Sequence, residues 1–400
     1  KADPFLFPEG LAAFQKKLGL TLITHNRWID LHSPYHNQYK ISGFAAIDTV
    51  YWKHIMRYLK NAGVIGYEQD WMNYIYMKNP EMISNINIGN AFTDGMAHSA
   101  QEYGINLQYC MALPRYFMQG VKYNNLTTIR PSGDGFMPKR WMPFIFTSQL
   151  GYEMGIWPWC DVFKSPETGN MIVSVLSAGP VGTGDAMGKE DKANILLACR
   201  NDGVLVKPDV PLLPMDEDYI QMARDERKPI LAYTYTKHSG ITTDYIFAFA
   251  DTGTTNMQVN FKPADIGMKG NLVVFNPLQN KVQAIFPNEN FQHELPKEKY
   301  TYYIIAPITN SGIAFLGDAG KITATGKKRV AAITSSEKSL QVKVLFAKGE
   351  SSVTLRGYCE HSVSADKGKI SMDAATHLFT LSLPAPANGN SVIVNLKTGK

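Results

Sequence analysis

The chain has 400 residues, of which 44% are hydrophobic and 19% charged, and its formal net charge is +5. This is the composition of an ordinary folded protein, and the length exceeds what one hydrophobic core usually holds, so we expect two domains. The densest basic run, residues 326–329, is too short to indicate a nucleic-acid surface. No apolar run reaches the roughly 18 residues of a membrane span. We therefore expect neither nucleic acid nor membrane as a partner.

Strand-like and helical segments alternate up to about residue 225. Six segments predict strands: residues 20–24, 64–68, 105–109, 127–130, 155–159 and 172–176. Several of them are apolar on both faces, which is typical of a parallel sheet covered by helices. Apolar residues recur every three to four positions over residues 47–62, which predicts a helix that Gly63 stops. This alternation indicates a parallel α/β architecture.

Polar residues cluster directly after four of these strands, in THNRW (24–28), EQDW (68–71), RPSGD (130–134) and WCD (159–161). In a closed barrel all strand ends share one face, whereas an open doubly wound sheet gathers ligands at one switch point. Four polar strand ends therefore favour a (β/α)8-type barrel. Only six of its eight strands are found, so the simplest interpretation is that one or two strand–helix units lie upstream of Lys1.

Short alternating strands separated by turn residues follow one another after residue 228. The candidates are residues 230–235, 245–250, 258–261, 271–275, 302–306, 340–347 and 391–396. This pattern predicts a C-terminal antiparallel β-sandwich. We accordingly expect a barrel domain over residues 1–228 and a β-sandwich domain over residues 229–400. Because the chain starts at Lys1, a processed N-terminus would favour a periplasmic or extracellular location. The compartment and the oligomeric state stay open.

Asp70 and Asp134 are the candidates for acid–base and nucleophilic chemistry. Each follows a predicted strand, and one strand–helix unit separates the two strands. Glycosidases need such a pair of carboxylates on separate rigid supports, one to attack the anomeric carbon and one to protonate the leaving oxygen. The alternative is that each aspartate caps the helix that follows it.

Other residues at the same strand ends are candidates for substrate binding. Glu68 lies two residues before Asp70 and should point to the same side of the strand. Cys110 ends its own strand, where a buried thiol remains an alternative. His32 and His36 have the spacing of a helical metal pair, but Pro34 between them disfavours a regular helix, and no C-x-x-C spacing occurs, so we expect no metal site. The full set of binding candidates is His25, Arg27, Trp28, Glu68, Trp71, Cys110, Arg130, Trp159 and Asp161.

At these residues the chain resembles glycoside hydrolase family 36, the raffinose synthase and α-galactosidase group, and in particular its raffinose synthase branch. The run GVIGYEQD (63–70) is similar to the family's nucleophile strand, which ends in Lys-x-Asp, and IRPSGDGF (129–136) is similar to its acid/base loop, roughly Arg-x-Ser-Asp-Asp-Phe. PWCDVF (158–163) resembles Pro-Asp-Trp-Asp-Met-Phe, and SAGPV (177–181) resembles Ser-Gly-Gly-Pro-Ile. Residues 302–317 also resemble the family's β domain.

The resemblance implies a retaining double displacement on an α-linked sugar, with an oligosaccharide or glycoside as substrate and with no metal or organic cofactor. Asp70 would be the nucleophile and Asp134 the general acid/base. Glu68 stands where the family has a sugar-contacting lysine, which reverses the charge and puts galactose specificity in question. We therefore predict an α-galactosidase-like glycoside hydrolase. The alternatives are a transglycosidase of the raffinose synthase type and a carbohydrate-binding barrel without catalysis.

Overall fold

A computed structural model describes residues 2–297 and 299–399 of the chain. These residues form two compact units. The first contains the chain up to Gly133 together with Leu150–Trp159, and the second contains Asp134–Gln149 and the chain from Cys160 onward. The domain boundary at residue 228 stays a prediction, and it falls between helix α10 (Asp216–Ala223) and strand β9 (Ile230–His238).

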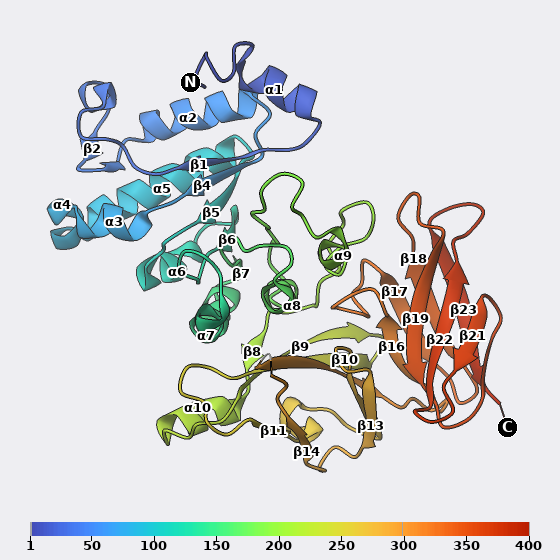
Figure 1. Cartoon of the computed structure of the whole chain (residues 1–400). Helices are drawn as coiled ribbons and strands as arrows, with labels where there is room; N and C mark the ends of the chain where they lie inside the picture. Colours follow the sequence, from blue (N-terminus) through green and yellow to red (C-terminus); the bar gives the residue numbers. More distant parts are fainter. Residues whose placement is uncertain (1, 298, 400) are drawn as a thin grey trace. The chain divides into compact units, whose positions relative to one another are not determined.

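A parallel sheet of five short strands forms the framework of the first unit (Figure 1). Its order is β1-β4-β5-β6-β7, and each neighbouring pair is parallel. Among the residues that the structure describes, no strand joins β1 to β7, so the sheet does not close into a barrel there. The strands are β1 (Ile23–Asn26), β4 (Gly66–Gln69), β5 (Asn106–Tyr109), β6 (Leu126–Ile129) and β7 (Trp157–Pro158).

Five of the six strands predicted for the first half form, with ends shifted by at most three residues. The sixth prediction, residues 172–176, is wrong, because this segment belongs to helix α8 (Thr168–Leu176). Eight of the nine residues of α8, from Gly169 to Leu176, are buried. A helix that is buried on every side presents an uninterrupted apolar run, and a short run of that kind cannot be distinguished from a buried strand by its periodicity.

Helices cover the sheet of the first unit. The predicted helix over residues 47–62 is confirmed as α2 (Thr49–Asn61), which begins where the Asp48 carboxylate accepts a hydrogen bond of 2.9 Å from the N–H of Val50. It runs beside α5 (Ile86–Glu102) (Figure 1), and Trp52 packs so closely on Gly95 that a Cβ there would lie 2.9 Å from the indole. The other elements of this unit are α1 (Gly10–Leu18), η1 (Pro34–Asn37), β2 (Ile41–Ser42), β3 (Ala45–Ala46), α3 (Met72–Met77), α4 (Pro80–Ser84) and α6 (Pro114–Gly120).

The second unit is mainly antiparallel. A six-stranded sheet has the order β13-β12-β15-β10-β9-β8, and β11 pairs with β14. Its strands are β8 (Leu213–Pro214), β9 (Ile230–His238), β10 (Ile241–Phe249), β11 (Gln258–Phe261), β12 (Leu272–Asn276), β13 (Lys281–Ile285), β14 (Phe291–Glu294) and β15 (Tyr300–Pro307). The helical segments assigned after β6 are η2 (Pro138–Arg140), α7 (Trp141–Glu153), α8, α9 (Lys192–Ile195), α10 (Asp216–Ala223) and η3 (Pro263–Ile266).

The C-terminal residues form two four-stranded antiparallel sheets, β16-β19-β22-β21 and β17-β18-β23-β20. One buried cluster joins them, with Leu355 and Phe379 from the first sheet and Val342 and Val394 from the second. This confirms the predicted β-sandwich. The strands are β16 (Ala314–Asp318), β17 (Val330–Ser335), β18 (Leu340–Leu345), β19 (Ser352–Tyr358), β20 (Val363–Ala365), β21 (Lys369–Met372), β22 (Leu378–Pro384) and β23 (Ser391–Thr398).

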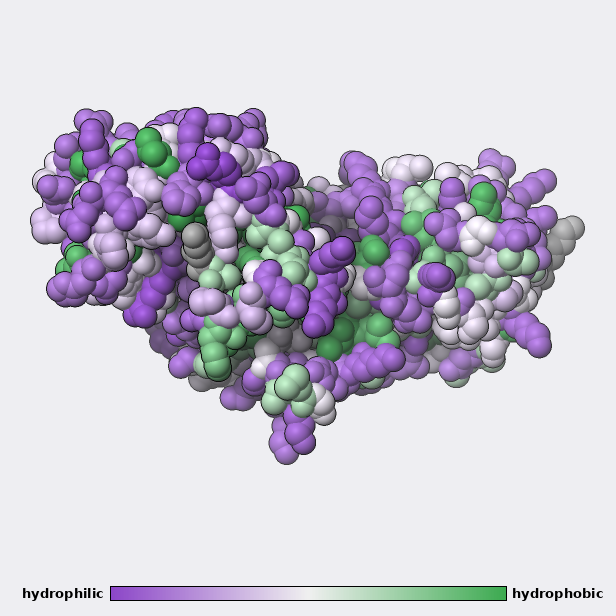
Figure 2. All heavy atoms as spheres, turned by 90° about the horizontal axis from the view of Figure 1, so that it is seen from above, coloured by the Kyte–Doolittle hydropathy of each residue, from purple (hydrophilic) through white to green (hydrophobic). Residues whose placement is uncertain are grey.

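None of the helices in the described part of the chain combines the length and the apolar character that a membrane crossing requires. On the face shown in Figure 2, hydrophilic residues alternate with small hydrophobic patches. Single exposed apolar side chains of this kind are ordinary on folded proteins.

Candidate functional site

Four predicted site residues occupy equivalent positions, each directly after a strand of the parallel sheet. The N–H groups of Asp70, Cys110, Arg130 and Trp159 donate to the last carbonyl of the preceding strand in the sheet, at 2.9, 3.0, 2.9 and 3.1 Å. The parallel ladder therefore continues one residue beyond β4, β5, β6 and β7. These four side chains are carried by the sheet itself and not by the loops that follow it.

One face of the sheet carries a polar row just before this edge. His25 on β1 pairs with Glu68 on β4, which pairs with Gln108 on β5, which in turn pairs with Thr128 on β6. The Thr128 hydroxyl donates to the Gln108 side-chain oxygen at 3.1 Å. The expectation that these strands are apolar on both faces is wrong, because only the opposite face, with Tyr67 and Leu107, joins the core of the unit.

The two oxygens of the Asp70 carboxylate have separate donors. Oδ1 accepts from the N–H of Trp71 at 2.6 Å, and Oδ2 lies 3.0 Å from Nε2 of His25. The side chain of Asp70 is 14% exposed. Burial raises the pKa of Asp70, but hydrogen bonds from Cys110, His25 and the Trp71 amide outweigh it, and the charge of Arg130 acts in the same direction. The net effect is a lowered pKa, so that Asp70 is ionised at neutral pH.

Glu68 and Cys110 lie beside Asp70 and titrate differently. Burial raises the pKa of Glu68, and the neighbouring Asp70 charge adds to this, while His25 and hydrogen bonds to Gln108 and Cys110 oppose it. Burial also raises the pKa of the Cys110 thiol well above its ordinary value. Cys110 is therefore a buried, neutral thiol that donates to Asp70, and its role in substrate binding stays a prediction.

An aromatic cluster with an arginine lies next to Asp70. The Arg27 guanidinium lies 3.7 Å above the ring of Trp28 and 4.6 Å from that of Trp71, and the two indoles contact each other edge to face at 5.1 Å. Trp71 has a φ of 57°, a strained conformation for a residue with a side chain. Further along the sheet edge, the Arg130 guanidinium lies 5.8 Å from the ring of Trp159. Nε1 of Trp159 is buried and has no hydrogen-bond partner among the described residues.

Gln69 is a site residue that sequence reasoning missed. Its side-chain amide is buried and donates to the carbonyls of Arg27 and Asp70, both at 2.9 Å. Its side-chain oxygen accepts from the hydroxyl of Tyr67 at 3.1 Å. Gln69 thereby ties the segment after β1 to the segment after β4. The sequence did carry one sign of this role: Gln69 is polar, although alternation along the strand places it on the same, core-facing side as Tyr67.

Asp134 and Asp161 belong to the second unit. Asp134 is exposed, and Gly135 beside it turns the chain with a φ of 65°. Oδ2 of Asp161 accepts a hydrogen bond of 2.6 Å from the N–H of Gly135. The carbonyl of Phe136 accepts from the side chain of Asn170 at 3.0 Å. These contacts fasten the segment with Asp134 to α8 and to the residues around Asp161.

The structure thus brings nine of the predicted residues into one connected cluster at the C-terminal edge of the parallel sheet: His25, Arg27, Trp28, Glu68, Asp70, Trp71, Cys110, Arg130 and Trp159. Within residues 2–297 and 299–399, no group of three or more His, Cys, Asp or Glu side chains has an arrangement that could hold a metal ion. His36 instead lies with Nε2 at 3.1 Å from the carbonyl of Asp30.

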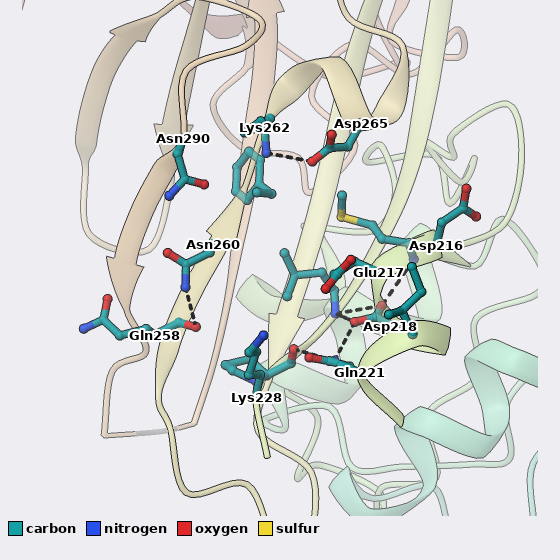
Figure 3. Close-up of a pocket in the computed structure, with 15 residues that line it drawn as sticks. Asp216, Glu217, Asp218, Gln221, Lys228, Gln258, Asn260, Lys262, Asp265 and Asn290 are labelled. Carbon is teal, nitrogen blue, oxygen red and sulfur yellow. Dashed lines mark hydrogen bonds between the residues drawn. The ribbon is translucent and has the colours of Figure 1, made fainter. Parts of the chain in front are cut away.

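A cavity of about 420 Å³ in the second unit contains none of these residues. It lies between α10 and β11, where Figure 3 shows Asp216, Glu217 and Asp218 on one side and Gln258 and Asn260 on the other. The buried carboxylate of Asp218 accepts hydrogen bonds from the N–H groups of Leu231 and Met215 and from Gln221. All these partners belong to α10 and β9 or adjoin them. Asp218 therefore fixes α10 against the sheet.

We predict that Asp218 makes the protein less stable as the pH rises. Burial raises the pKa of Asp218 to about 8, against the lowering effect of its amide donors, and Glu217 adds to the increase. The folded chain then keeps a proton that the unfolded chain loses near pH 4. The stabilisation is complete below about pH 4 and is lost as the pH rises to about 8, by up to about 1.4 kcal/mol for each pH unit. Urea unfolding between pH 5 and 8 measures how the free energy of unfolding changes with pH. The Asp218→Asn variant should lack the decrease that Asp218 causes. The Asp265→Asn variant, which changes an exposed aspartate of the same cavity, should keep it. Equal slopes in wild type and Asp218→Asn would contradict the prediction.

The sequence matches no protein-family model and no curated protein. Solved structures do share its fold. A family 27 β-L-arabinopyranosidase from Geobacillus stearothermophilus superposes with a TM-score of 0.51 at 13% identity over 74% of this chain and 76% of that one. An alanine variant of that enzyme in complex with arabinose gives a TM-score of 0.53 at 12% identity over 74% and 77%. A Bacillus halodurans protein assigned as an α-N-acetylgalactosaminidase gives 0.51 at 13% identity over 76% and 81%. The fold is that of a (β/α)8 barrel followed by a C-terminal β domain, as predicted, and the described residues supply five of its parallel strands.

Proposed function

We propose that this chain is the catalytic part of a retaining glycoside hydrolase that acts on α-linked sugars. The observation that carries the proposal is the Asp70 carboxylate, which is ionised, partly exposed and held by two donors at the C-terminal edge of the parallel sheet. Barrel enzymes place their chemistry at this edge. The likeness in fold to family 27 glycosidases supports the same class.

In this proposal Asp70 is the nucleophile and Asp134 the general acid/base. Asp70 attacks the anomeric carbon as Asp134 gives its proton to the leaving oxygen, which forms a glycosyl-enzyme ester. Asp134 then takes a proton from water, whose oxygen attacks the anomeric carbon and releases Asp70. The lowered pKa of Asp70 suits a nucleophile. Asp134 is exposed and follows β6 by five residues, as Asp70 directly follows β4.

We further propose an α-galactosidase-like substrate and roles in sugar binding for the other residues of the cluster. The indoles of Trp28, Trp71 and Trp159 supply apolar surface for the C–H face of a sugar ring, and the unpartnered Nε1 of Trp159 supplies a donor for a hydroxyl. Glu68 supplies an acceptor where the resembling family has a donor. Asp161 supports the substrate site through the segment that carries Asp134.

Turnover of a panel of aryl glycosides tests the proposal. The panel contains the α-galactoside, α-glucoside, α-N-acetylgalactosaminide and β-L-arabinopyranoside, because β-L-arabinopyranose is α-D-galactopyranose without its hydroxymethyl group. We expect one member to be hydrolysed and its first-formed sugar to keep the anomeric configuration by NMR. An inverted product would overturn the double displacement. Binding of a glycoside without turnover would favour the non-catalytic barrel.

We predict that Gln69→Leu lowers kcat by about 10- to 100-fold with little change in KM. Gln69 does not touch the reacting atoms, but it holds the carbonyls of Arg27 and Asp70, and a displacement of about 1 Å at a nucleophile has effects of this size. Gln69→Asn, which keeps an amide donor on a shorter side chain, should retain more activity. An equal loss in both variants, together with a large fall in melting temperature, would indicate a purely structural role.

A further inference from the structure

The six-stranded sheet of the second unit contains a buried carboxylate without a complete set of partners. Asp244 lies in β10, opposite Tyr235 of β9 and Ile305 of β15. Its side chain is 2% exposed. Oδ2 is fully buried and has no hydrogen-bond partner among the residues that the structure describes. Ile246 and Ala248, which alternate with it along β10, belong to an apolar cluster, so Asp244 is the polar end of an otherwise apolar row.

Asp244 faces a cavity of about 380 Å³. Tyr233 and Tyr235 of β9 line one part of it, and the turn with Met268 and Lys269 lines another. Lys237 and Thr242, which pair across β9 and β10, complete the polar lining. This volume lies within the range of roughly 300–1,000 Å³ that small-molecule pockets have.

A buried acceptor without a donor costs folding free energy, and a ligand that supplies the donor recovers it. Burial raises the pKa of Asp244 to about 7, which shows how poorly the protein alone solvates this charge. The groups around it narrow the chemistry of the missing donor. Lys237 and Lys269 disfavour a cationic ligand, and Asp244 itself disfavours an anion at the floor of the cavity. A neutral ligand with hydroxyl donors satisfies both conditions.

We propose that this cavity is a second carbohydrate-binding site, in which the Asp244 carboxylate accepts hydrogen bonds from the hydroxyls of one sugar ring. Tyr233 and Tyr235 provide the aromatic surface on which the C–H face of such a ring packs. The ring belongs either to a free glycoside or to a residue of a polysaccharide. The inference does not depend on the proposed hydrolysis, because none of its residues belongs to the Asp70 cluster.

Methyl NMR of the full chain with ¹³C-methyl methionine tests this site. Met268 lines the cavity and reports on it, whereas Met72 lies in α3, two residues after Asp70, and reports on the other site. The probes are methyl α-D-galactopyranoside, methyl α-D-glucopyranoside and methyl β-L-arabinopyranoside, added up to 100 mM to the Asp70→Asn variant so that no probe is hydrolysed. Met268→Leu assigns the reporter resonance. Native electrophoresis in gels that contain galactomannan or dextran tests whether the cavity binds a sugar residue of a polysaccharide.

We expect a saturable shift of the Met268 resonance with at least one glycoside, or retardation in at least one polysaccharide. Asp244→Leu should weaken either response at least fivefold, and Glu294→Gln, an exposed carboxylate on β14, should leave it unchanged. Asp244→Leu should fold, since it removes an unpaired buried polar group, and Tyr235→Ala tests the same cavity if it does not. No shift and no retardation with any probe would overturn the proposal. A response that persists in Asp244→Leu and in Tyr235→Ala would overturn it as well.

Discussion

Replacing Asp70 by asparagine should lower kcat on the hydrolysed aryl glycoside by about 10⁴-fold or more, because the amide cannot form the glycosyl-enzyme ester. The fold should persist. Asparagine keeps an acceptor for the Trp71 amide and has the size of aspartate, so KM should change far less than kcat. Stopped-flow release of the aryl group measures the first step directly. Wild type should show a burst if breakdown of the ester limits turnover, and the variant should show none.

Glu102→Gln is the matched control for this change. Glu102 is half exposed and pairs with Lys53 at 2.8 Å on the surface of the same unit, so its conversion to an amide should leave kcat within about twofold. A second route to the same conclusion is covalent labelling. A 2-fluoroglycosyl fluoride of the turned-over sugar should add one glycosyl group, and peptide mapping should place it on Asp70. A label on Glu68 would instead identify Glu68 as the nucleophile.

The second large effect is expected for Asp134→Asn, and it should depend on the leaving group. Loss of general acid catalysis should lower kcat/KM by about 10²–10⁴-fold for glycosides with a poorly acidic aglycone. For a dinitrophenyl glycoside the first step needs no proton, so the substitution should mainly slow the breakdown of the glycosyl-enzyme ester. Azide attacks that ester without a general base. It should therefore raise the turnover of Asp134→Asn and give a glycosyl azide of retained configuration.

Asp161→Asn separates the role of Asp134 from that of its support. Asp161 accepts a hydrogen bond from the Gly135 amide. Its replacement should therefore lower kcat/KM by the same modest factor for the glycoside with a poorly acidic aglycone and for the dinitrophenyl glycoside. Azide should not restore the turnover of this variant. Azide rescue in Asp161→Asn but not in Asp134→Asn would contradict the assignment. A uniform loss for all aglycones in Asp134→Asn would do so too.

The strand ends were the part of the molecule that the sequence predicted best. An apolar run followed at once by polar residues located Asp70, Arg130 and Trp159, and Cys110 was found at the end of its own predicted strand. The parallel ladder places all four in register. Such a pattern is local, so it can be recognised without knowledge of the partners. The roles of these residues, like the pairing of Asp70 with Asp134, stay predictions.

Features that depend on distant partners were missed. The role of Gln69 arises from carbonyls that its own segment does not contain. Helix α8 was misassigned because burial on all sides erased its periodicity. In the second unit, edge strands such as β13 (Lys281–Ile285), with mixed exposed residues, carry little alternation for a sequence to show. Strand β13 forms because it pairs with β12, and its own sequence does not identify it as a strand.

The continuation of the ladder beyond each strand has a consequence for motion at the site. The amide protons of Asp70, Cys110, Arg130 and Trp159 can exchange with solvent only when the sheet itself opens, since each is bonded to a neighbouring strand. Asp134 lies four residues beyond the last such bond on its segment. Asp70, the proposed nucleophile, is thus held by the sheet itself, whereas the segment of Asp134, the proposed acid/base, is held by the separate contacts of Gly135 and Phe136. Hydrogen exchange at the amide of Asp70 should therefore report on the opening of the parallel sheet.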